Sequence, residues 1–241
     1  TFVATGMAVL MCGAIPVFSD IDPHTGNICV ESIKKKITKR TKAIIPVHWS
    51  GLPCDMEEIH RLTYENSREE IDRMFVIEDA AHALGATYKG TPIGSCRHSS
   101  YSAFSLQATK ILTTGDGGIL TCSNATDCKE AMERRWFGIP RDSEVGLLGE
   151  REYLLEDVGF KFHMNDLAAS LGLANLWDFG QRLDRRQMWG RRLRKELDGV
   201  KGVELLRLPP DRTHSYYVFS MKVERRDQFV LAMKERGIPT S

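Results

Sequence analysis

Residues 75–86 read Phe-Val-Ile-Glu-Asp-Ala-Ala-His-Ala-Leu-Gly-Ala, and this stretch decides the fold. A short apolar run ends in two carboxylates, Glu78 and Asp79, and then passes into small residues. Continuous apolar strands are typical of a sheet that is covered on both faces. In open α/β sheets, ligands bind beyond the carboxyl ends of the strands, so Asp79 stands where a ligand-facing group is expected. An acid at this place also commonly caps a helix, and the spacing alone leaves that alternative open.

Similar short β-branched runs recur on both sides of this stretch. They lie at residues 15–18, 43–47, 101–104 and 119–121. Helical patterns are expected between them, at about residues 31–38, 55–65 and 125–135. This alternation predicts a doubly wound α/β domain, in which helices cover both faces of a mainly parallel sheet.

The pattern changes from Asn165 onwards. Residues 165–197 read as one long helix with a leucine-rich apolar face. A strand at 216–221 and a helix at 226–235 then predict the start of a smaller α/β domain. We therefore expect a large domain over residues 1–165, a connecting helical segment over 166–200, and the beginning of a small C-terminal domain over 201–241.

Composition argues against several classes of protein. The 241 residues carry 33 Lys and Arg against 32 Asp and Glu, a formal charge of +1, so neither nucleic acid nor an acidic membrane is indicated as partner. Six scattered cysteines, without a CxxC pair or zinc spacing, indicate no disulfide framework and no structural metal, and fit a reducing cytoplasm. No apolar run approaches the roughly 20 residues that span a bilayer. Since the chain opens at Thr1, directly before a helical pattern, we expect a piece of a longer protein.

A second distinctive segment surrounds Lys110. Residues 101–118 read Tyr-Ser-Ala-Phe-Ser-Leu-Gln-Ala-Thr-Lys-Ile-Leu-Thr-Thr-Gly-Asp-Gly-Gly. A single lysine among small, apolar and hydroxyl side chains is unusual on a solvated surface. Desolvation lowers the pKa of a lysine and frees its amine to form a Schiff base. Taken alone, the segment reads equally well as a surface lysine before a glycine-rich turn. The glycines match neither a phosphate loop nor a dinucleotide fingerprint.

Six ordered motifs extend these two segments through nearly the whole chain. They are Gly13–Asp22, Ile44–His48, Glu78–His82, Ser105–Lys110, Thr113–Gly118 and Gly159–Asp166. In this order they resemble the sugar-nucleotide aminotransferases of the DegT/StrS group, which depend on pyridoxal 5′-phosphate (PLP). The resemblance implies a three-layer α/β/α sandwich with a mainly parallel sheet, the large domain of the PLP-dependent transferase type I fold, followed by the start of the small domain.

The resemblance assigns roles to three residues of the two central segments. Lys110 matches the lysine that carries PLP as an internal aldimine and then moves the proton between substrate and cofactor. Asp79 matches the carboxylate that pairs with the pyridine nitrogen and keeps it protonated. His82 stands where the family commonly has Gln, which binds the 3′-oxygen of the cofactor. Because His82 departs from that type, a packed histidine stays as the alternative.

Four further residues match positions around the cofactor. Phe2 matches an aromatic ring over one face of PLP, and Ala81 matches a small residue against the other face. Ser105 matches a hydroxyl that binds the cofactor phosphate, whereas the family's Gly-Thr-Ala-like phosphate segment would precede Thr1. Lys161 replaces an Asn that reaches the phosphate of the partner subunit, so the resemblance implies a homodimer with shared active sites.

The resemblance also suggests the reaction. Related dehydratases have histidine in place of the lysine, so Lys110 favours transamination. The implied reaction moves an amino group from glutamate or glutamine to a keto carbon of a nucleotide diphosphate sugar, for amino-sugar, O-antigen, cell-surface polysaccharide or antibiotic-sugar biosynthesis. His48, His163 and the basic stretch 134–141, with Arg135 and Arg141, are the candidates for the substrate pocket.

Other functions stay open at this point. One is a non-catalytic sensor or structural relative that keeps the fold, although Asp79, Ser105 and Lys110 together argue against it. Another is a family member that acts on a non-nucleotide cyclic ketone. A nucleotide-binding oxidoreductase would need a glycine fingerprint directly after a strand, and the sequence has none.

Overall fold

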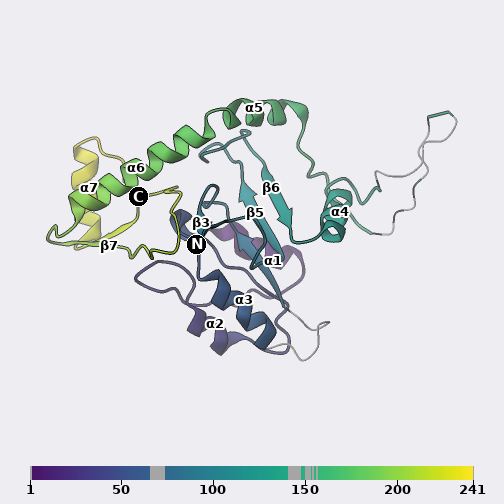
Figure 1. The fold of residues 1–241 in the computed structure, drawn as a ribbon, viewed down its shortest axis with the longest axis horizontal. Helices are drawn as coiled ribbons and strands as arrows, with labels where there is room; N and C mark the ends of the chain where they lie inside the picture. Colours follow the sequence, from purple (N-terminus) through teal and green to yellow (C-terminus); the bar gives the residue numbers. More distant parts are fainter. Residues whose placement is uncertain are drawn as a thin grey trace.

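The computed structural model describes residues 2–65, 74–140, 148–149, 153, 155 and 157–240. In chain order they form α1 (Val3–Met11), α2 (Val30–Lys36), β1 (Ala43–Ile44), the 3-10 turn η1 (Trp49–Gly51), α3 (Met56–Glu65), β2 (Phe75–Asp79), β3 (Thr87–Tyr88), β4 (Thr91–Pro92), β5 (Tyr101–Ser105), β6 (Gly118–Cys122), α4 (Ala125–Arg134), α5 (Asp166–Leu176), α6 (Phe179–Leu197), β7 (Val203–Leu205), β8 (Met221–Val223) and α7 (Arg226–Glu235) (Figure 1).

The central sheet has the strand order β1-β2-β5-β6. β1 and β5 run parallel to β2 on its two sides, and β6 returns antiparallel to β5. The apolar core lies between this sheet and α2 and α3, where Ile33, Ile59, Leu62 and Val76 are all buried. The predicted α/β fold with a mainly parallel sheet is therefore confirmed.

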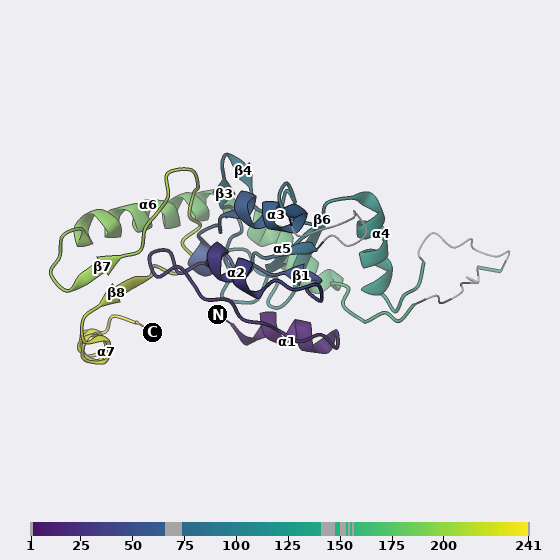
Figure 2. The ribbon, with the colours of Figure 1, turned by 90° about the horizontal axis from the view of Figure 1, so that it is seen from below.

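The pleat of β2 directs its residues to two faces. Side chains alternate along a strand, so Val76 and Glu78 share one face while Ile77 and Asp79 share the other. Val76 packs in the core with α3. Asp79 accepts a hydrogen bond from Thr5 of α1 at 2.6 Å. Figure 2 shows α1 on the other side of the strands from α3, so helices flank both faces of the sheet.

Residues 15–18 are not a strand, so that prediction is wrong. Ile15, Val17 and Phe18 are 67–81% exposed, and none of the four residues pairs with a strand in the described chain. β-branched residues favour an extended backbone, but a strand also needs a neighbour for its hydrogen bonds. The run at 43–47, in contrast, pairs with β2 in parallel at Ala43–Ile44 and again at Val47, which bridges Asp79.

The single long helix predicted from residue 165 is two helices. α5 ends at Leu176 and α6 begins at Phe179, and the side chain of Arg182 donates to Asn175 across the break. Apolar periodicity continues through the break, which is why the sequence pattern does not reveal it.

The predicted strand at 216–221 is mostly a return segment, defined as residues 213–220, that packs on η1 and on the turn after β2. Ser215 donates from its backbone N–H to the Gly51 carbonyl at 3.1 Å, and from its hydroxyl to the His82 carbonyl at 2.6 Å. Tyr216 has a left-handed backbone with φ of 51°, which no regular strand contains. Side-chain and backbone contacts with η1 therefore replace strand pairing here.

Two features are absent from the described residues. No helix there is long and apolar enough to cross a membrane. No group of three or more His, Cys, Asp or Glu side chains is arranged there to hold a metal ion.

We predict that Gly51→Ala destabilises the protein. Its new Cβ would stand 2.0 Å from Ser215 Oγ and 2.8 Å from the His82 carbonyl oxygen, and φ is 102°. Such a strained backbone costs about 1–3 kcal/mol. Gly180→Ala in α6 is the matched control, because its Cβ meets nothing within 4 Å and alanine favours a helix by about 1 kcal/mol. Urea unfolding measures both, and equal midpoints would contradict the close docking of the return segment.

Candidate active site

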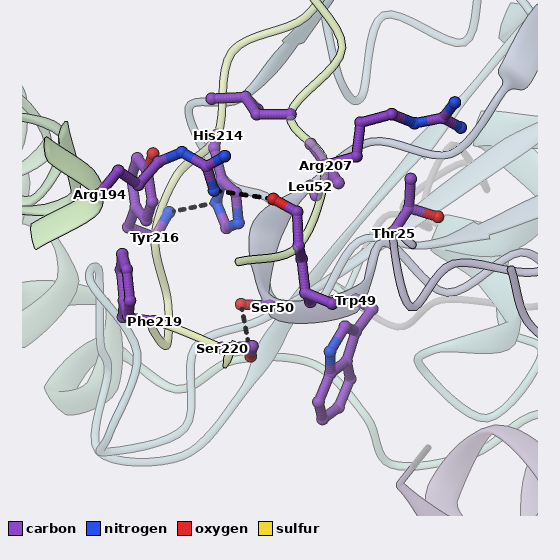
Figure 3. A pocket seen from close by; sticks show the side chains of 12 residues that line it. Thr25, Trp49, Ser50, Leu52, Arg194, Arg207, His214, Tyr216, Phe219 and Ser220 are labelled. Atoms are coloured by element: carbon purple, nitrogen blue, oxygen red, sulfur yellow. Dashed lines mark hydrogen bonds between the residues drawn. The ribbon is translucent and has the colours of Figure 1, made fainter. Parts of the chain in front are cut away.

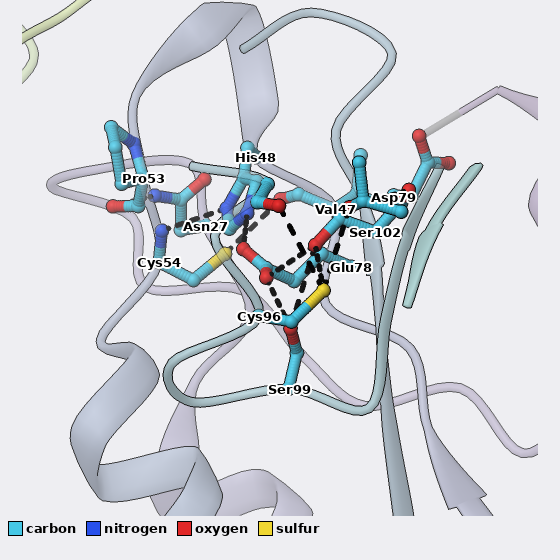
Figure 4. A network of polar contacts seen from close by, with 12 residues as sticks. Asn27, Val47, His48, Pro53, Cys54, Glu78, Asp79, Cys96, Ser99 and Ser102 are labelled. Atoms are coloured by element: carbon cyan, nitrogen blue, oxygen red, sulfur yellow. Dashed lines mark hydrogen bonds and ion pairs between the residues drawn. The ribbon is translucent and has the colours of Figure 1, made fainter. Parts of the chain in front are cut away.

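Glu78 is the acceptor at the centre of a buried polar network (Figure 4). Its carboxylate accepts hydrogen bonds from Ser99 Oγ at 2.5 Å and Ser102 Oγ at 2.7 Å, and lies 2.8 Å from His48 Nε2. Burial acts to raise the pKa of Glu78, but the bonds from His48, Ser102 and Ser99 together hold it below its ordinary value. Glu78 is thus a buried carboxylate whose charge is stabilised by hydrogen bonds inside the protein.

His48 is part of this network and not of a substrate pocket, so its predicted substrate role is wrong. The ring is fully buried, and Nδ1 accepts from the backbone N–H of Cys54 at 3.1 Å. Nε2 therefore carries the proton and donates to Glu78. The backbone N–H of His48 also donates to the carbonyl oxygen of Asp79 at 3.1 Å. His48 accordingly fixes the end of β2 from the interior.

Asp79 presents its carboxylate on the opposite face from Glu78. Oδ2 accepts from Thr5 Oγ1 at 2.6 Å and Oδ1 accepts from the backbone N–H of Ala81 at 3.2 Å. Residues 80–86 form turns and no helix begins there, so the alternative of a helix N-cap is wrong. Two donors orient a half-exposed carboxylate at the carboxyl end of a parallel strand.

A pocket brings the two distinctive sequence segments together, and we name it the amine pocket after Lys110. Its walls come from the turn after β2, the segment after β5, α6 and the return segment. The lining residues are Ala81, His82, Leu84, Ser105, Lys110, Ile111, Arg186, Ser215 and Tyr217. Four of the residues predicted from the sequence, Ala81, His82, Ser105 and Lys110, therefore share one pocket.

Tyr217 brings the return segment into contact with Lys110. The Lys110 ammonium lies 4.1 Å from the centroid of the Tyr217 ring, a cation–π contact. The same ring stacks on His82 at 4.2 Å with an interplanar angle of 18°. Tyr217 Oη lies 3.0 Å from Thr109 Oγ1. The local sequence around Tyr217 does not indicate this role, because Tyr217 reaches the pocket through contacts with residues more than 100 positions earlier in the chain.

The imidazole ring of His82 is neutral, and one of its nitrogens lacks a hydrogen-bond partner among the described residues. Burial, and then the charge of Lys110, lower the pKa of His82 to about 4. Its Nδ1 is buried and has no hydrogen-bond partner among the described residues. Because a buried unpaired ring nitrogen is costly, it is suited to bind a polar atom of a molecule in the pocket.

The remaining predicted residues lie outside the walls of the amine pocket. Phe2 precedes α1 and is 71% exposed. Lys161 is exposed and lies 5.8 Å from the ring of Trp136, against which His163 packs edge-on at 4.2 Å. His163 Nδ1 is also buried without a partner in the described chain. No described contact joins these residues to Lys110 within one chain.

The arginines of the basic stretch 134–141, a candidate for the substrate pocket, have different surroundings. Arg134 pairs with Glu130 at 2.8 Å and with Asp157, so its charge is already matched. Arg135 ends α4 as its C-cap. Arg141 lies outside the described residues.

A second pocket lies on the other side of the return segment and contains none of the predicted residues (Figure 3). Arg194 donates to the Leu206 carbonyl at 2.8 Å there. The rings of His214 and Tyr216 stack at 4.1 Å, and burial lowers the pKa of His214 to about 4. The Tyr216 backbone N–H donates to His214 Nδ1 and Ser220 donates to Ser50, so these contacts join the return segment to itself and to η1, and the pocket is a packing seam between the two.

Comparison with known proteins identifies the family. The family model described as "DegT/DnrJ/EryC1/StrS aminotransferase family" matches residues 1–241. The chain belongs to this family. The family that the sequence motifs resembled is therefore confirmed.

The chain is similar to part of several longer proteins. The UDP-4-amino-4-deoxy-L-arabinose–oxoglutarate aminotransferase of Shewanella sediminis is 33% identical over 99% of this chain and 61% of its own length. The sugar aminotransferase CalS13 of Micromonospora echinospora superposes with a TM-score of 0.92 at 33% identity, over 100% of this chain and 64% of that one. A sugar aminotransferase of Streptococcus pneumoniae in a PLP form gives a TM-score of 0.85 at 26% identity, over 98% and 63%. The chain thus spans less than two thirds of these proteins.

The neutral state of His82 predicts a pH dependence of stability. Its pKa is about 4 in the folded protein against an ordinary 6.5, so between these values the unfolded chain binds the extra proton. Stability therefore falls as the pH is lowered from 6.5 towards 4. We predict that His82→Gln, which cannot titrate, loses less stability over this range in urea unfolding. His214→Gln should lower the slope separately, because the pKa of His214 is also about 4, and the double variant should lower it further than either single variant. An unchanged slope in His82→Gln would contradict the assignment.

Proposed function

We propose that the protein containing this chain is a PLP-dependent aminotransferase that acts on a nucleotide diphosphate sugar. The amino donor, glutamate or glutamine, becomes a 2-oxo acid, and the keto carbon of the sugar receives the amine. The gathering of His82, Ser105 and Lys110 in one pocket carries the proposal. The names of the relatives support a role in polysaccharide or antibiotic-sugar biosynthesis.

The amine pocket fits the cofactor on three observations. Lys110 supplies a primary amine, and Ser105 supplies a hydroxyl for a phosphate. His82 offers a buried nitrogen without a partner for the 3′-oxygen. Asp79, at the end of the neighbouring strand, would hold the protonated ring nitrogen, and Ala81 and Phe2 would lie against the two faces of the ring. When bound, PLP supplies an aldehyde carbon and a ring that accepts electrons.

The residues around Lys110 and Asp79 have separate tasks. Lys110 would link to the cofactor and, once released by the donor, carry a proton between carbon atoms. Thr5 donates to Asp79 and so restricts its carboxylate to one orientation. Tyr217 holds the ammonium of Lys110 over its ring, which gives the released amine a defined resting position.

We predict that the full-length protein with PLP shows a visible absorbance band that borohydride removes. Peptide mapping should then find a pyridoxyl group on Lys110. Lys110→Ala should lose both signals, because no other lysine lines the amine pocket among the described residues. Lys34→Ala is the matched control, since Lys34 pairs with Glu31 on the surface of α2. A label on another lysine would contradict the proposed role of Lys110.

Two other functions remain as outcomes of experiments. A non-catalytic relative would keep the fold and show no amine transfer from glutamate or glutamine to any ketone. A family member acting on a cyclic ketone would accept a ketone that carries no nucleotide. The arrangement of Asp79, His82 and Lys110 favours the enzyme over the non-catalytic relative. We also propose that the enzyme is cytoplasmic, where nucleotide sugars are made.

We further propose a homodimer with shared sites, in which Lys161 reaches the cofactor phosphate of the partner subunit. Lys161 lies outside the amine pocket of its own chain, as a residue with a function in the other subunit would. Leu167 of α5 and Trp177 at its C-cap are 86% and 94% exposed, and a subunit interface would remove such apolar surface from water. Each site would then need residues from both chains.

Mixing two inactive variants tests the shared site. Lys110→Ala and Lys161→Ala should each have low activity alone. Unfolding and refolding them together should restore activity, because one site of each mixed dimer receives an intact Lys110 and an intact Lys161. Random pairing gives about a quarter of the wild-type value. No recovery, with mixed dimers shown by native mass spectrometry, would place Lys161 outside the partner's site.

A further inference from the structure

Arg186 lines the amine pocket from α6, and the proposed function gives it no role. Lys110, Ser105 and His82 line the same pocket. Arg186 is partly buried, and its charge acts on Tyr217, which contacts Lys110. A side chain with five hydrogen-bond donors and a permanent charge therefore faces the space in which the amine of Lys110 works.

Arg186 has no counter-ion among the described residues. No carboxylate pairs with it there, and the titratable side chains of the described chain that act on it are Tyr217 and Arg182. Arg182, one turn earlier on α6, differs: it pairs with Asp178 at 3.0 Å and donates to Asn175. Burial lowers the pKa of Arg186, Tyr217 opposes this change, and Arg182 adds to it.

An unpaired guanidinium in a pocket indicates an anionic ligand. Arg186 is only partly buried, and a guanidinium that no carboxylate neutralises leaves a positive charge in the pocket that attracts an anion. Guanidinium groups match carboxylates and phosphates with two parallel hydrogen bonds. The pocket around Arg186 thus selects for an oxyanion.

We propose that Arg186 binds the α-carboxylate of the amino donor. The inference rests on the proposed function and adds the donor subsite to it. In an amino acid, the amine and the α-carboxylate are bonded to the same carbon, so a donor whose nitrogen replaces that of Lys110 brings its carboxylate to a wall of the same pocket. Glutamate and glutamine share this carboxylate, so both would bind.

Two other oxyanions could occupy the site, and the experiment separates them from the donor. One is the phosphate of the cofactor, for which Ser105 is the proposed ligand. The other is the diphosphate of the sugar nucleotide. Each of the three anions enters a different measurement: the affinity for PLP, the reaction with the amino donor alone, and the reaction with the sugar nucleotide alone.

The test uses Arg186→Met, which keeps much of the side-chain length without the charge, and Arg186→Lys, which keeps the charge without the planar fork. Arg185→Met is the matched control, because Arg185 is the next residue on α6 and is exposed. The full-length holoenzyme is measured in two ways. One is the absorbance change with L-glutamate or L-glutamine in the absence of sugar nucleotide. The other is calorimetric binding of 2-oxoglutarate.

We expect Arg186→Met to raise the KM for both donors and the Kd for 2-oxoglutarate by about 10- to 100-fold, the loss of a charged hydrogen-bond pair. Arg186→Lys should recover part of the affinity, and Arg185→Met should match the wild type. PLP affinity and the reaction with sugar nucleotide should stay unchanged. The urea midpoint of Arg186→Met should hold or rise, because an unpaired charge has been removed from the pocket.

Three results would overturn the inference. Loss of PLP affinity in Arg186→Met would assign the residue to the cofactor phosphate. A loss confined to the sugar-nucleotide reaction would assign it to the diphosphate, and wild-type behaviour in every assay would leave it no ligand. Failure of the proposed function is distinct, because it shows in the unmodified protein as the absence of a pyridoxyl label on Lys110.

Discussion

The pleat at the end of β2 is the constraint on which the site depends. It sends two consecutive carboxylates to opposite faces, Glu78 into the interior and Asp79 towards α1. His48, Ser99 and Ser102 donate hydrogen bonds to the carboxylate of Glu78 and so neutralise it within the interior. The carboxylate of Asp79 can still accept a hydrogen bond from a ligand. A slip of one residue in the register would exchange them and bury the wrong acid. The interior network therefore fixes the register as well as filling the core.

The amine pocket is assembled from parts that are distant in the sequence. The return segment is held by Ser215 on Gly51 and on the His82 carbonyl, and this contact places Tyr217 beside Lys110. Two groups of the pocket lack a partner within the described part of the chain: the buried Nδ1 of His82 has no hydrogen-bond partner, and the partly buried guanidinium of Arg186 has no counter-ion. Polar groups without a partner lower the stability of the protein, and they are expected in a binding site where a ligand supplies the missing partner. The function proposed here and the energetics of the pocket thus point to the same residues.

Sequence patterns predicted the strands at Phe75–Asp79 and Tyr101–Ser105 and the short helices closely, because local periodicity records which side is buried. The patterns failed where the pairing of strands determines the structure. Residues 15–18 have side chains typical of a strand, but no strand of the described chain pairs with them. His48 was a candidate for the substrate pocket from its position in the chain alone, and the structure shows that both of its ring nitrogens form hydrogen bonds in the interior. Tyr217 and Arg186 were missed since each reaches the pocket through tertiary contacts. The division into domains at residues 165 and 200, and the individual roles of the site residues, stay predictions.

A crystal structure of the full-length protein with PLP would show whether β2 places its acid at the cofactor. We predict density continuous from Lys110 Nζ to the cofactor, with the pyridine nitrogen within hydrogen-bond distance of Asp79 and the Thr5–Asp79 bond retained. Glu78 should remain bonded to His48 in the interior. A cofactor attached to another lysine, or a pyridine nitrogen directed away from Asp79, would contradict the account, because the pleat of β2 would then not position the acid that the chemistry needs.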